Sequence, residues 1–93
     1  LTTGGTGLGP RDVTPEATKA ILDIEIPGIP EAMRMESMKK TSFSMLSRSV
    51  SGVRSGCLII NLPGSPKGVS ECLEIIISTL PHALEMIRGW RTH

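Results

Sequence analysis

The residues that could do chemistry gather in two short loops of similar design. Each loop follows the end of an apolar run, turns on glycine, and reaches a hydroxyl residue followed by proline. The first loop runs from Gly4 to Pro15 and the second from Pro63 to Pro66. A helix that begins after such a loop offers unpaired backbone N–H groups and a partial positive charge to an anion. The two loops therefore predict a site for a phosphate-bearing ligand.

Neither loop matches a standard nucleotide signature. No Gly-Lys-Ser/Thr sequence closes the first loop, and its glycine spacing misses the dinucleotide fingerprint by one residue. Each helix terminus contributes only about 0.3–1 kcal/mol toward a negative group, so Arg11, Arg48 or Lys67 is needed as a further contact. The alternative interpretation is that the glycines only turn strands into helices. Two matched loops favour ligand binding.

Asp12 is the candidate for catalysis, because it lies in the first loop beside Arg11 and two residues before Thr14. A carboxylate about 4 Å from a phosphate is repelled by roughly 4 kcal/mol at an effective dielectric near 20. Asp12 near phosphate therefore implies a bridging cation, and Mg²⁺ suits one carboxylate combined with phosphate oxygens. The alternative is that Asp12 only bonds the turn before the helix.

The elements that would position these loops alternate between strands and helices, which is typical of an α/β fold. Thr14 and Ser65 are predicted N-caps, each with proline next. The run Cys57-Leu58-Ile59-Ile60-Asn61-Leu62 predicts a central strand covered on both faces. The predicted order is a strand end at 1–3, helices at 15–24 and 30–38, an irregular strand or hairpin at 45–54, the strand at 57–62, and helices at 65–80 and 83–89, with residues 90–93 frayed.

Periodic apolar residues predict which helix faces are buried. The expected faces are Ala17, Ile21 and Ile24 in the first helix, Ala32, Met35 and Met38 in the second, and Val69, Cys72, Leu73, Ile76 and Leu80 in the third, with Pro81 ending it.

Composition excludes several classes of protein. The chain has 93 residues, a formal net charge of +1, 39% hydrophobic and 20% charged residues. Such a chain builds one modest core, and it lacks both the charge and the aromatic residues that would indicate nucleic-acid binding. No apolar run approaches the ~18 residues of a membrane span. Cys57 and Cys72 are expected to be buried thiols in a reducing cytosol, and His82 is expected at the surface.

Longer motifs resemble the molybdenum cofactor biosynthesis family of molybdopterin-binding domains. The resemblance lies in Leu1-Thr2-Thr3-Gly4-Gly5-Thr6-Gly7 and Pro10-Arg11-Asp12-Val13-Thr14-Pro15-Glu16-Ala17-Thr18. It continues in Met45-Leu46-Ser47-Arg48 and in residues 58–68, where the chain is most similar to the gephyrin-like branch and its plant counterpart. The matched motifs cover nearly the whole chain.

The resemblance implies a three-layer α/β/α domain, usually trimeric, that adenylylates molybdopterin with ATP and Mg²⁺. By position it implies that Asp12 is catalytic and a tentative Mg²⁺ ligand. Implied nucleotide and phosphate contacts are Gly4, Gly5, Thr6, Gly7, Arg11 and Thr14, and implied molybdopterin contacts are Ser47, Arg48, Gly64, Ser65 and Lys67.

Family members carry further strands and a second acid before the glycine loop. The resemblance therefore implies one partial domain over residues 1–93, truncated at its N-terminus, whose activity depends on the upstream strands. Gephyrin-like members also imply a fused molybdenum-insertion domain. Two alternatives stay open. One is a non-catalytic molybdopterin-binding or scaffold module. The other is the bacterial sister branch, although residues 65–68 are more similar to the gephyrin-like branch.

Overall fold

The structure is a computed structural model, and it describes residues 1–89. The predicted fraying of residues 90–93 lies outside the described residues. The elements, in chain order, are β1 (Thr2–Thr3), α1 (Thr14–Ile21), β2 (Ile24–Glu25), α2 (Gly28–Ser37), a 3-10 helix η1 (Ser42–Leu46), β3 (Ser51–Arg54), β4 (Cys57–Leu62), α3 (Pro66–Ile76) and α4 (Leu80–Ile87).

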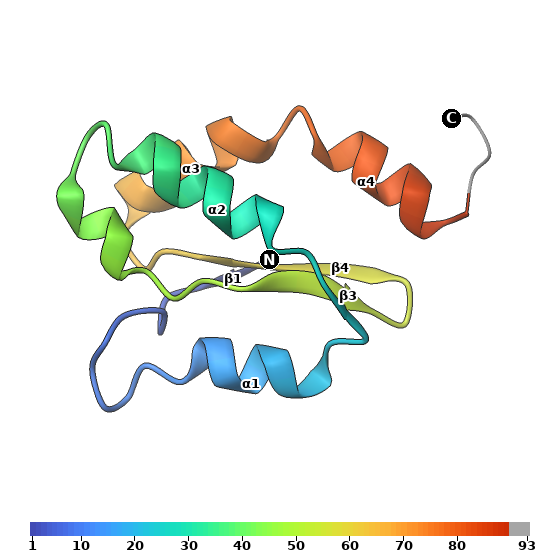
Figure 1. Ribbon diagram of the computed structural model, residues 1–93, viewed down its shortest axis with the longest axis horizontal. Coiled ribbons are helices and arrows are strands. Elements are labelled where there is room, and N and C mark those ends of the chain that lie inside the picture. The colour runs from blue at the N-terminus through green and yellow to red at the C-terminus, as the bar shows by residue number, and fades with distance from the viewer. Residues whose placement is uncertain (90–93) are drawn as a thin grey trace.

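Four strands form one mixed sheet in the order β1-β4-β3-β2. β1 runs parallel to β4, whereas β2, β3 and β4 pair antiparallel. In Figure 1, α1 lies on one face of the sheet and α2, α3 and α4 lie on the other. These three layers confirm the predicted α/β class, and β4, with a neighbour on each side, is the interior strand that its apolar run predicts.

A tight hairpin joins β3 to β4. Its turn residues, Ser55 and Gly56, both have left-handed φ values, of 48° and 77°. Two successive residues of this kind are typical of the hairpin turns that match strand twist. The hairpin interpretation of residues 45–54 is therefore confirmed for Ser51–Arg54, whereas Met45 and Leu46 belong to η1, which was not predicted.

The core lies between the sheet and α2 and α3. Ile60 and Leu62 of β4 are fully buried there, against Met33 of α2 and Cys72 and Ile76 of α3. The predicted inner face of the third helix is confirmed, since its partly buried members Val69 and Leu73 also pack on this cluster, and Leu80 packs there from α4. On α2, the buried residues are Ile29 and Met33, four residues apart.

Two predicted helix faces are wrong. In α2, Ala32, Met35 and Met38 are all exposed, because the inner face of this helix follows a spacing of four rather than three. In α1, Ala17 and Ile21 are exposed, whereas Pro15 and Thr18 are buried. Leu22 is already extended, so Ile24 leaves the helix and pairs with Val53 in the sheet.

Three helix termini also differ from prediction. α2 begins at Gly28 rather than Pro30, since proline is tolerated in a first turn. α3 ends at Ile76, and Pro81 lies in the first turn of α4 instead of ending α3. Thr14 is the first residue of α1 and not its N-cap, which is Val13, and the Thr14 N–H bonds the Gly5 carbonyl at 3.1 Å.

The two cysteines have different environments. Cys72 is buried as predicted, and burial raises the pKa of its thiol. Cys57 is exposed, which corrects the prediction of two buried thiols, because it begins β4 next to the hairpin turn. His82 is exposed on α4, as expected.

Candidate functional site

The sheet brings the two glycine loops together. Thr3 of β1 is paired with Leu62 of β4, and because these strands run parallel, both loops leave the same edge of the sheet. Gly4 N–H donates to the Leu62 carbonyl at 3.0 Å. A Cβ added to Gly64 would lie 3.4 Å from the Cα of Gly4, so the two backbones are in contact.

The first loop needs glycine for two reasons. Gly4 and Gly5 have left-handed φ values of 84° and 71°, a conformation that only glycine adopts readily. A Cβ on Gly5 would lie 2.2 Å from the Oγ1 of Thr14. The predicted role of glycine in turning the chain is therefore present, and it also lets the start of α1 pack against the loop.

Asp12 closes a turn inside the same loop. Its Oδ2 accepts a hydrogen bond from Gly9 N–H at 2.8 Å, and its own N–H donates to the Gly9 carbonyl at 3.0 Å. A Cβ on Gly7 or Gly9 would lie 2.9 or 3.0 Å from this Oδ2. The turn-bonding interpretation of Asp12 is thus observed. Within residues 1–89, however, Oδ1 makes no hydrogen bond and is free to bind a ligand.

Arg48 bonds the first loop from the other side. Its Nε donates to the Gly7 carbonyl at 2.7 Å and its Nη2 to the Asp12 carbonyl at 2.5 Å. Its Nη1 forms a hydrogen-bonded ion pair with Glu16, and this bond lowers the pKa of the Glu16 carboxyl below its usual value. The backbone N–H of Arg48 donates to the Thr6 carbonyl at 2.9 Å.

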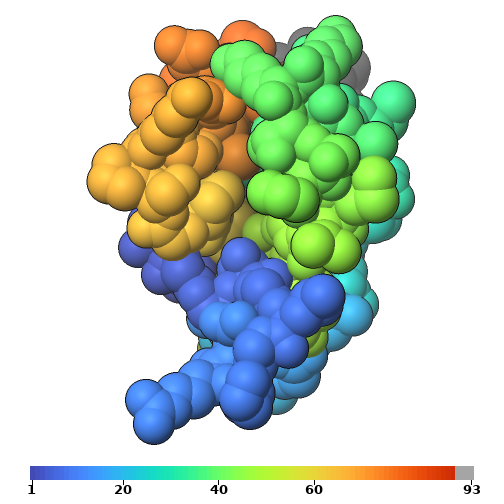
Figure 2. Space-filling view, turned by 90° about the vertical axis from the view of Figure 1, so that its left-hand side faces the viewer, coloured from blue at the N-terminus to red at the C-terminus, as the bar shows by residue number. Residues whose placement is uncertain are grey.

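A cleft of about 310 Å³ opens beside the two loops. Figure 2 shows it between the green atoms of α2 and η1 and the orange atoms of α3, above the blue atoms of the first loop. Four predicted site residues line it: Thr6, Gly7, Ser47 and Ser65. Its apolar lining includes Met33 and Phe43. A cleft with apolar walls and a few polar groups at one end is typical of a small-molecule site.

The second loop begins α3 as the sequence predicts. Ser65 is the N-cap, and its Oγ accepts from Gly68 N–H at 3.0 Å. Lys67 extends outward, with its side chain 89% exposed and its Nζ 4.0 Å from the Glu71 carboxylate. Such a loose exposed pair contributes little to stability, so the Lys67 ammonium can reach an anion without losing a strong partner.

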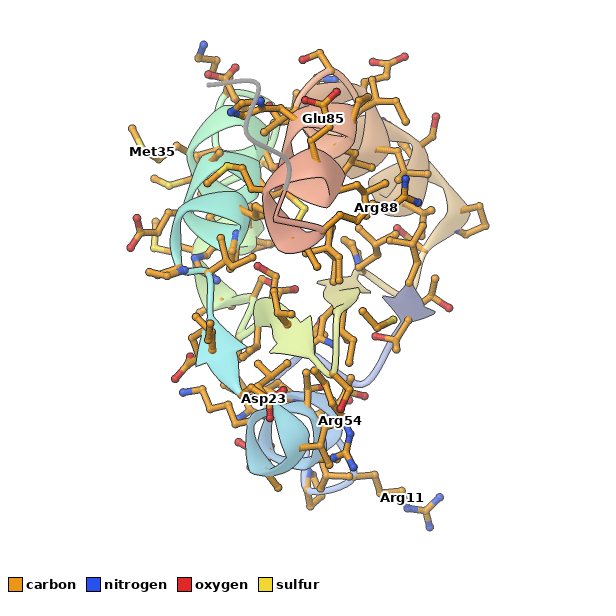
Figure 3. The ribbon with its side chains drawn as sticks, turned by 90° about the vertical axis from the view of Figure 1, so that its right-hand side faces the viewer. Arg11, Asp23, Met35, Arg54, Glu85 and Arg88 are labelled. Atoms are coloured by element: carbon orange, nitrogen blue, oxygen red, sulfur yellow. The ribbon has the colours of Figure 1, made fainter. Side chains whose placement is uncertain are left out.

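The other predicted residues are distributed around this edge. Gly4 and Gly64 form the contact between the loops, and Gly5 packs against Thr14. Arg11 is exposed, and in Figure 3 its side chain points away from the body of the molecule. The structure therefore brings the backbone of both loops and the serines together, while the two exposed cations, Arg11 and Lys67, lie at the outside.

Two residues near the site were not predicted. Glu16 pairs with Arg48, and Arg34 Nη1 donates to the carbonyls of Ser47 and Ser49 at 3.4 and 3.3 Å. An acidic residue in the first turn of a predicted helix was the available signal for Glu16. The sequence has no comparable signal for Arg34, whose acceptors lie 13 and 15 residues away on another element.

Within residues 1–89, no three His, Cys, Asp or Glu side chains are grouped to hold a metal ion. In the same part of the chain, no helix is long and apolar enough to cross a membrane.

Comparisons with known proteins point to one family. Residues 1–82 match the family described as "Probable molybdopterin binding domain". The chain is 51% identical to the molybdenum cofactor synthesis protein cinnamon of Drosophila melanogaster, over 94% of the chain. It is 48% identical to a molybdopterin adenylyltransferase of Helicobacter pylori, over 96% of the chain. The molybdopterin biosynthesis Mog protein of Mycobacterium ulcerans has the same fold, with a TM-score of 0.91 and 49% identity over 95% of the chain.

The chain spans only part of these proteins. It covers 51% of the Helicobacter pylori relative, 14% of cinnamon and 57% of the Mycobacterium ulcerans chain. The fly and bacterial relatives are similar to it at nearly equal identity, so these values do not separate the eukaryotic branch from the bacterial one.

Proposed function

The chain belongs to the family of molybdopterin-binding domains, and from that membership we propose that it carries the substrate loops of an enzyme that adenylylates molybdopterin with ATP during molybdenum cofactor synthesis. The observation that carries the proposal is the contact between Gly4 and Gly64, at the ends of two parallel strands. Ligands of α/β sheets bind beyond the carboxyl ends of such strands. Two phosphate-bearing substrates can therefore meet there.

The reaction is an in-line transfer. A terminal phosphate oxygen of molybdopterin forms a bond to the α-phosphorus of ATP, the bond from that phosphorus to the pyrophosphate oxygen breaks, and pyrophosphate leaves. No protein nucleophile is required, so the protein acts by positioning and by offsetting charge. We assign the nucleotide phosphates to Gly4–Gly7, with Thr14 and Arg11 nearby, and molybdopterin to the side formed by Ser47, Gly64, Ser65 and Lys67.

Asp12 fits a role with Mg²⁺. One carboxylate oxygen fixes the turn through Gly9, while Oδ1 makes no hydrogen bond within residues 1–89. A single carboxylate oxygen combined with phosphate oxygens matches the ligand preference of this ion, and the ion when bound would offset phosphate charge. The turn then serves to hold the carboxylate in a fixed position before substrate arrives.

The family also suggests a wider setting. We propose that the functional protein is a cytosolic homotrimer, and that a molybdenum-insertion domain is fused to it in gephyrin-like members. The fused domain is supported by the length of cinnamon, since the chain matches only 14% of that protein and the rest has room for such a domain. Sedimentation of the full-length protein tests the trimer.

The proposed chemistry is tested by Asp12→Asn. The amide oxygen of asparagine can still accept from Gly9 N–H, so the fold should be kept, while the loss of the negative charge removes the proposed Mg²⁺ ligand. We expect adenylyl-molybdopterin formation from ATP, Mg²⁺ and molybdopterin to fall by about 100-fold or more. Adenylyl-molybdopterin and pyrophosphate are measured together in assays of the full-length protein.

Asp23→Asn is the matched control. Asp23 also accepts from a backbone N–H through one carboxylate oxygen, that of Ser55 at 2.7 Å, but it lies beside the β3–β4 hairpin near Arg54 (Figure 3). Its variant should keep full turnover. If the wild-type protein binds molybdopterin yet forms no adenylylated product, the transfer proposal is wrong and a binding module takes its place.

A further inference from the structure

We propose that Arg48 is a positioning residue, which holds the loop carrying Asp12 in place together with Glu16, and that it is not a contact for substrate phosphate. This inference rests on the proposed function, because the position of Asp12 matters only if the loop serves a substrate. The sequence resemblance implies that Arg48 contacts molybdopterin, and the inference replaces that role with one in holding the loop. It also gives Glu16 a role in holding the loop, whereas the sequence motifs imply none.

The geometry of the guanidinium carries the inference. Its three nitrogen atoms each donate to a different acceptor: the Gly7 carbonyl at 2.7 Å, the Asp12 carbonyl at 2.5 Å, and the carboxylate of Glu16. These acceptors lie 41, 36 and 32 residues before Arg48 in the chain. Three of the five N–H donors of the guanidinium are therefore committed to the loop and to Glu16, and Arg48 is not among the residues that line the cleft beside the two loops.

The loop depends on the hydrogen bonds from Arg48 more than on the hydrogen bonds within the loop. Between Gly7 and Asp12, two hydrogen bonds lie within the loop, and both join Asp12 to Gly9. Those two bonds fix the shape of the turn but do not attach it to the sheet. Arg48 attaches both ends of the turn, at Gly7 and at Asp12, and its backbone N–H attaches the preceding Thr6 at 2.9 Å.

Arg48 is itself held at the start of the segment that leads into the sheet. It follows Ser47, whose Oγ lies 3.0 Å from the Oγ of Ser49, and Arg34 donates to the carbonyls of both serines. Ser47 lines the cleft, so the same segment faces the proposed molybdopterin side and holds the proposed Asp12 loop. Arg48 thereby fixes the distance between the two halves of the site.

Arginine is needed here because its planar fork donates in several fixed directions at once. Lysine keeps the charge, but its three N–H donors share one nitrogen, so it cannot reach the separate acceptors on Gly7, Asp12 and Glu16 together. We therefore expect Arg48→Lys and Arg48→Met both to lower kcat by about 100-fold, the loss that a displacement near 1 Å can cause. The KM for molybdopterin should stay unchanged.

Arg54 supplies the matched control. It is an exposed arginine with one hydrogen bond, from its Nη1 to the Ile21 carbonyl at 3.3 Å, at the far end of α1. Arg54→Lys and Arg54→Met should leave kcat and KM as in the wild type. If Arg48→Lys restores turnover, or if Arg48→Met raises KM for molybdopterin with kcat kept, charge on the substrate explains Arg48 and the positioning proposal is wrong.

Amide hydrogen exchange gives a readout that does not need turnover. In Arg48→Met, the N–H groups of Gly9 and Asp12 should exchange at least about 10-fold faster, since local opening of the loop sets their protection. The N–H of Asn61 in β4 should exchange as in the wild type, which shows that the fold is intact. Unchanged exchange at Gly9 and Asp12 overturns the proposal. If the wild type has no adenylylation activity, the proposed function fails, and exchange alone still decides whether Arg48 holds the loop.

Discussion

Gly5 lies where a side chain has no room, because a Cβ there would be 2.2 Å from the Oγ1 of Thr14 and its φ is +71°. Gly5→Ala should therefore lose more than the about 1–2 kcal/mol that a left-handed conformation alone costs. Denaturant unfolding measures the loss. Gly56→Ala is the control, since Gly56 has a φ of +77° but open space around its Cα. Equal losses in the two variants would show that the contact with Thr14 is unimportant.

The residue types of the site could be predicted from sequence, but their partners could not. Glycine, aspartate and hydroxyl residues predict a phosphate-binding loop because each type has a local role in turning the chain or beginning a helix. Arg48 gave no such local signal, because its three acceptors lie more than thirty residues away and are set by tertiary packing. Asp12 can fill both predicted roles, because Oδ2 bonds the turn while Oδ1 is available for a cation.

Asn61 joins three elements at the centre of the sheet. It is fully buried in β4, and its Nδ2 donates to the Oγ1 of Thr2 in β1 at 2.9 Å and to the Oγ1 of Thr18 in α1 at 3.0 Å. Its Oδ1 accepts from Val50 N–H at 3.1 Å. Asn61→Leu leaves the Val50 N–H without this partner, and that alone should cost about 1–3 kcal/mol.

Thr18→Val is the comparison for this variant. It keeps the shape of the side chain and removes one acceptor of Asn61, so its unfolding free energy should fall by less than that of Asn61→Leu. Thermal and denaturant unfolding measure both. A neutral Asn61→Leu would mean that apolar packing replaces the network, and that β1 and α1 are held to β4 by other contacts.

Elements with strong local signals were predicted, and those set by pairing were not. Ser65 followed by Pro66 begins α3 as expected, and the apolar run of β4 gives its strand. Ile24 continued the helical spacing of α1, yet it pairs with Val53 in a two-residue strand. Such a short strand exists only because β3 is beside it, so no pattern within residues 15–25 could have indicated it.

Several large apolar side chains are exposed on the described surface. On the first loop and around α1 these include Leu8, Val13 and Ile24, which are 66%, 58% and 63% exposed. The chain matches 51% of the Helicobacter pylori relative, so about half of that protein lies outside the matched part.

Nucleotide binding to the whole molecule is measured by thermal unfolding with and without ATP and Mg²⁺. A ligand at about 100 times its dissociation constant that binds only the folded state adds roughly 2.7 kcal/mol. We expect that gain in a protein of the full length of the bacterial relative, and only when ATP and Mg²⁺ are present together, because in the proposed site a cation separates the Asp12 carboxylate from the phosphates. Mg²⁺ alone and ATP with a chelator are the controls. The Asp12→Asn variant should lose the part of the shift that depends on Mg²⁺, while Asp23→Asn keeps it. A cooperative transition that no combination of ATP and Mg²⁺ moves would mean that the glycine loops do not hold the nucleotide.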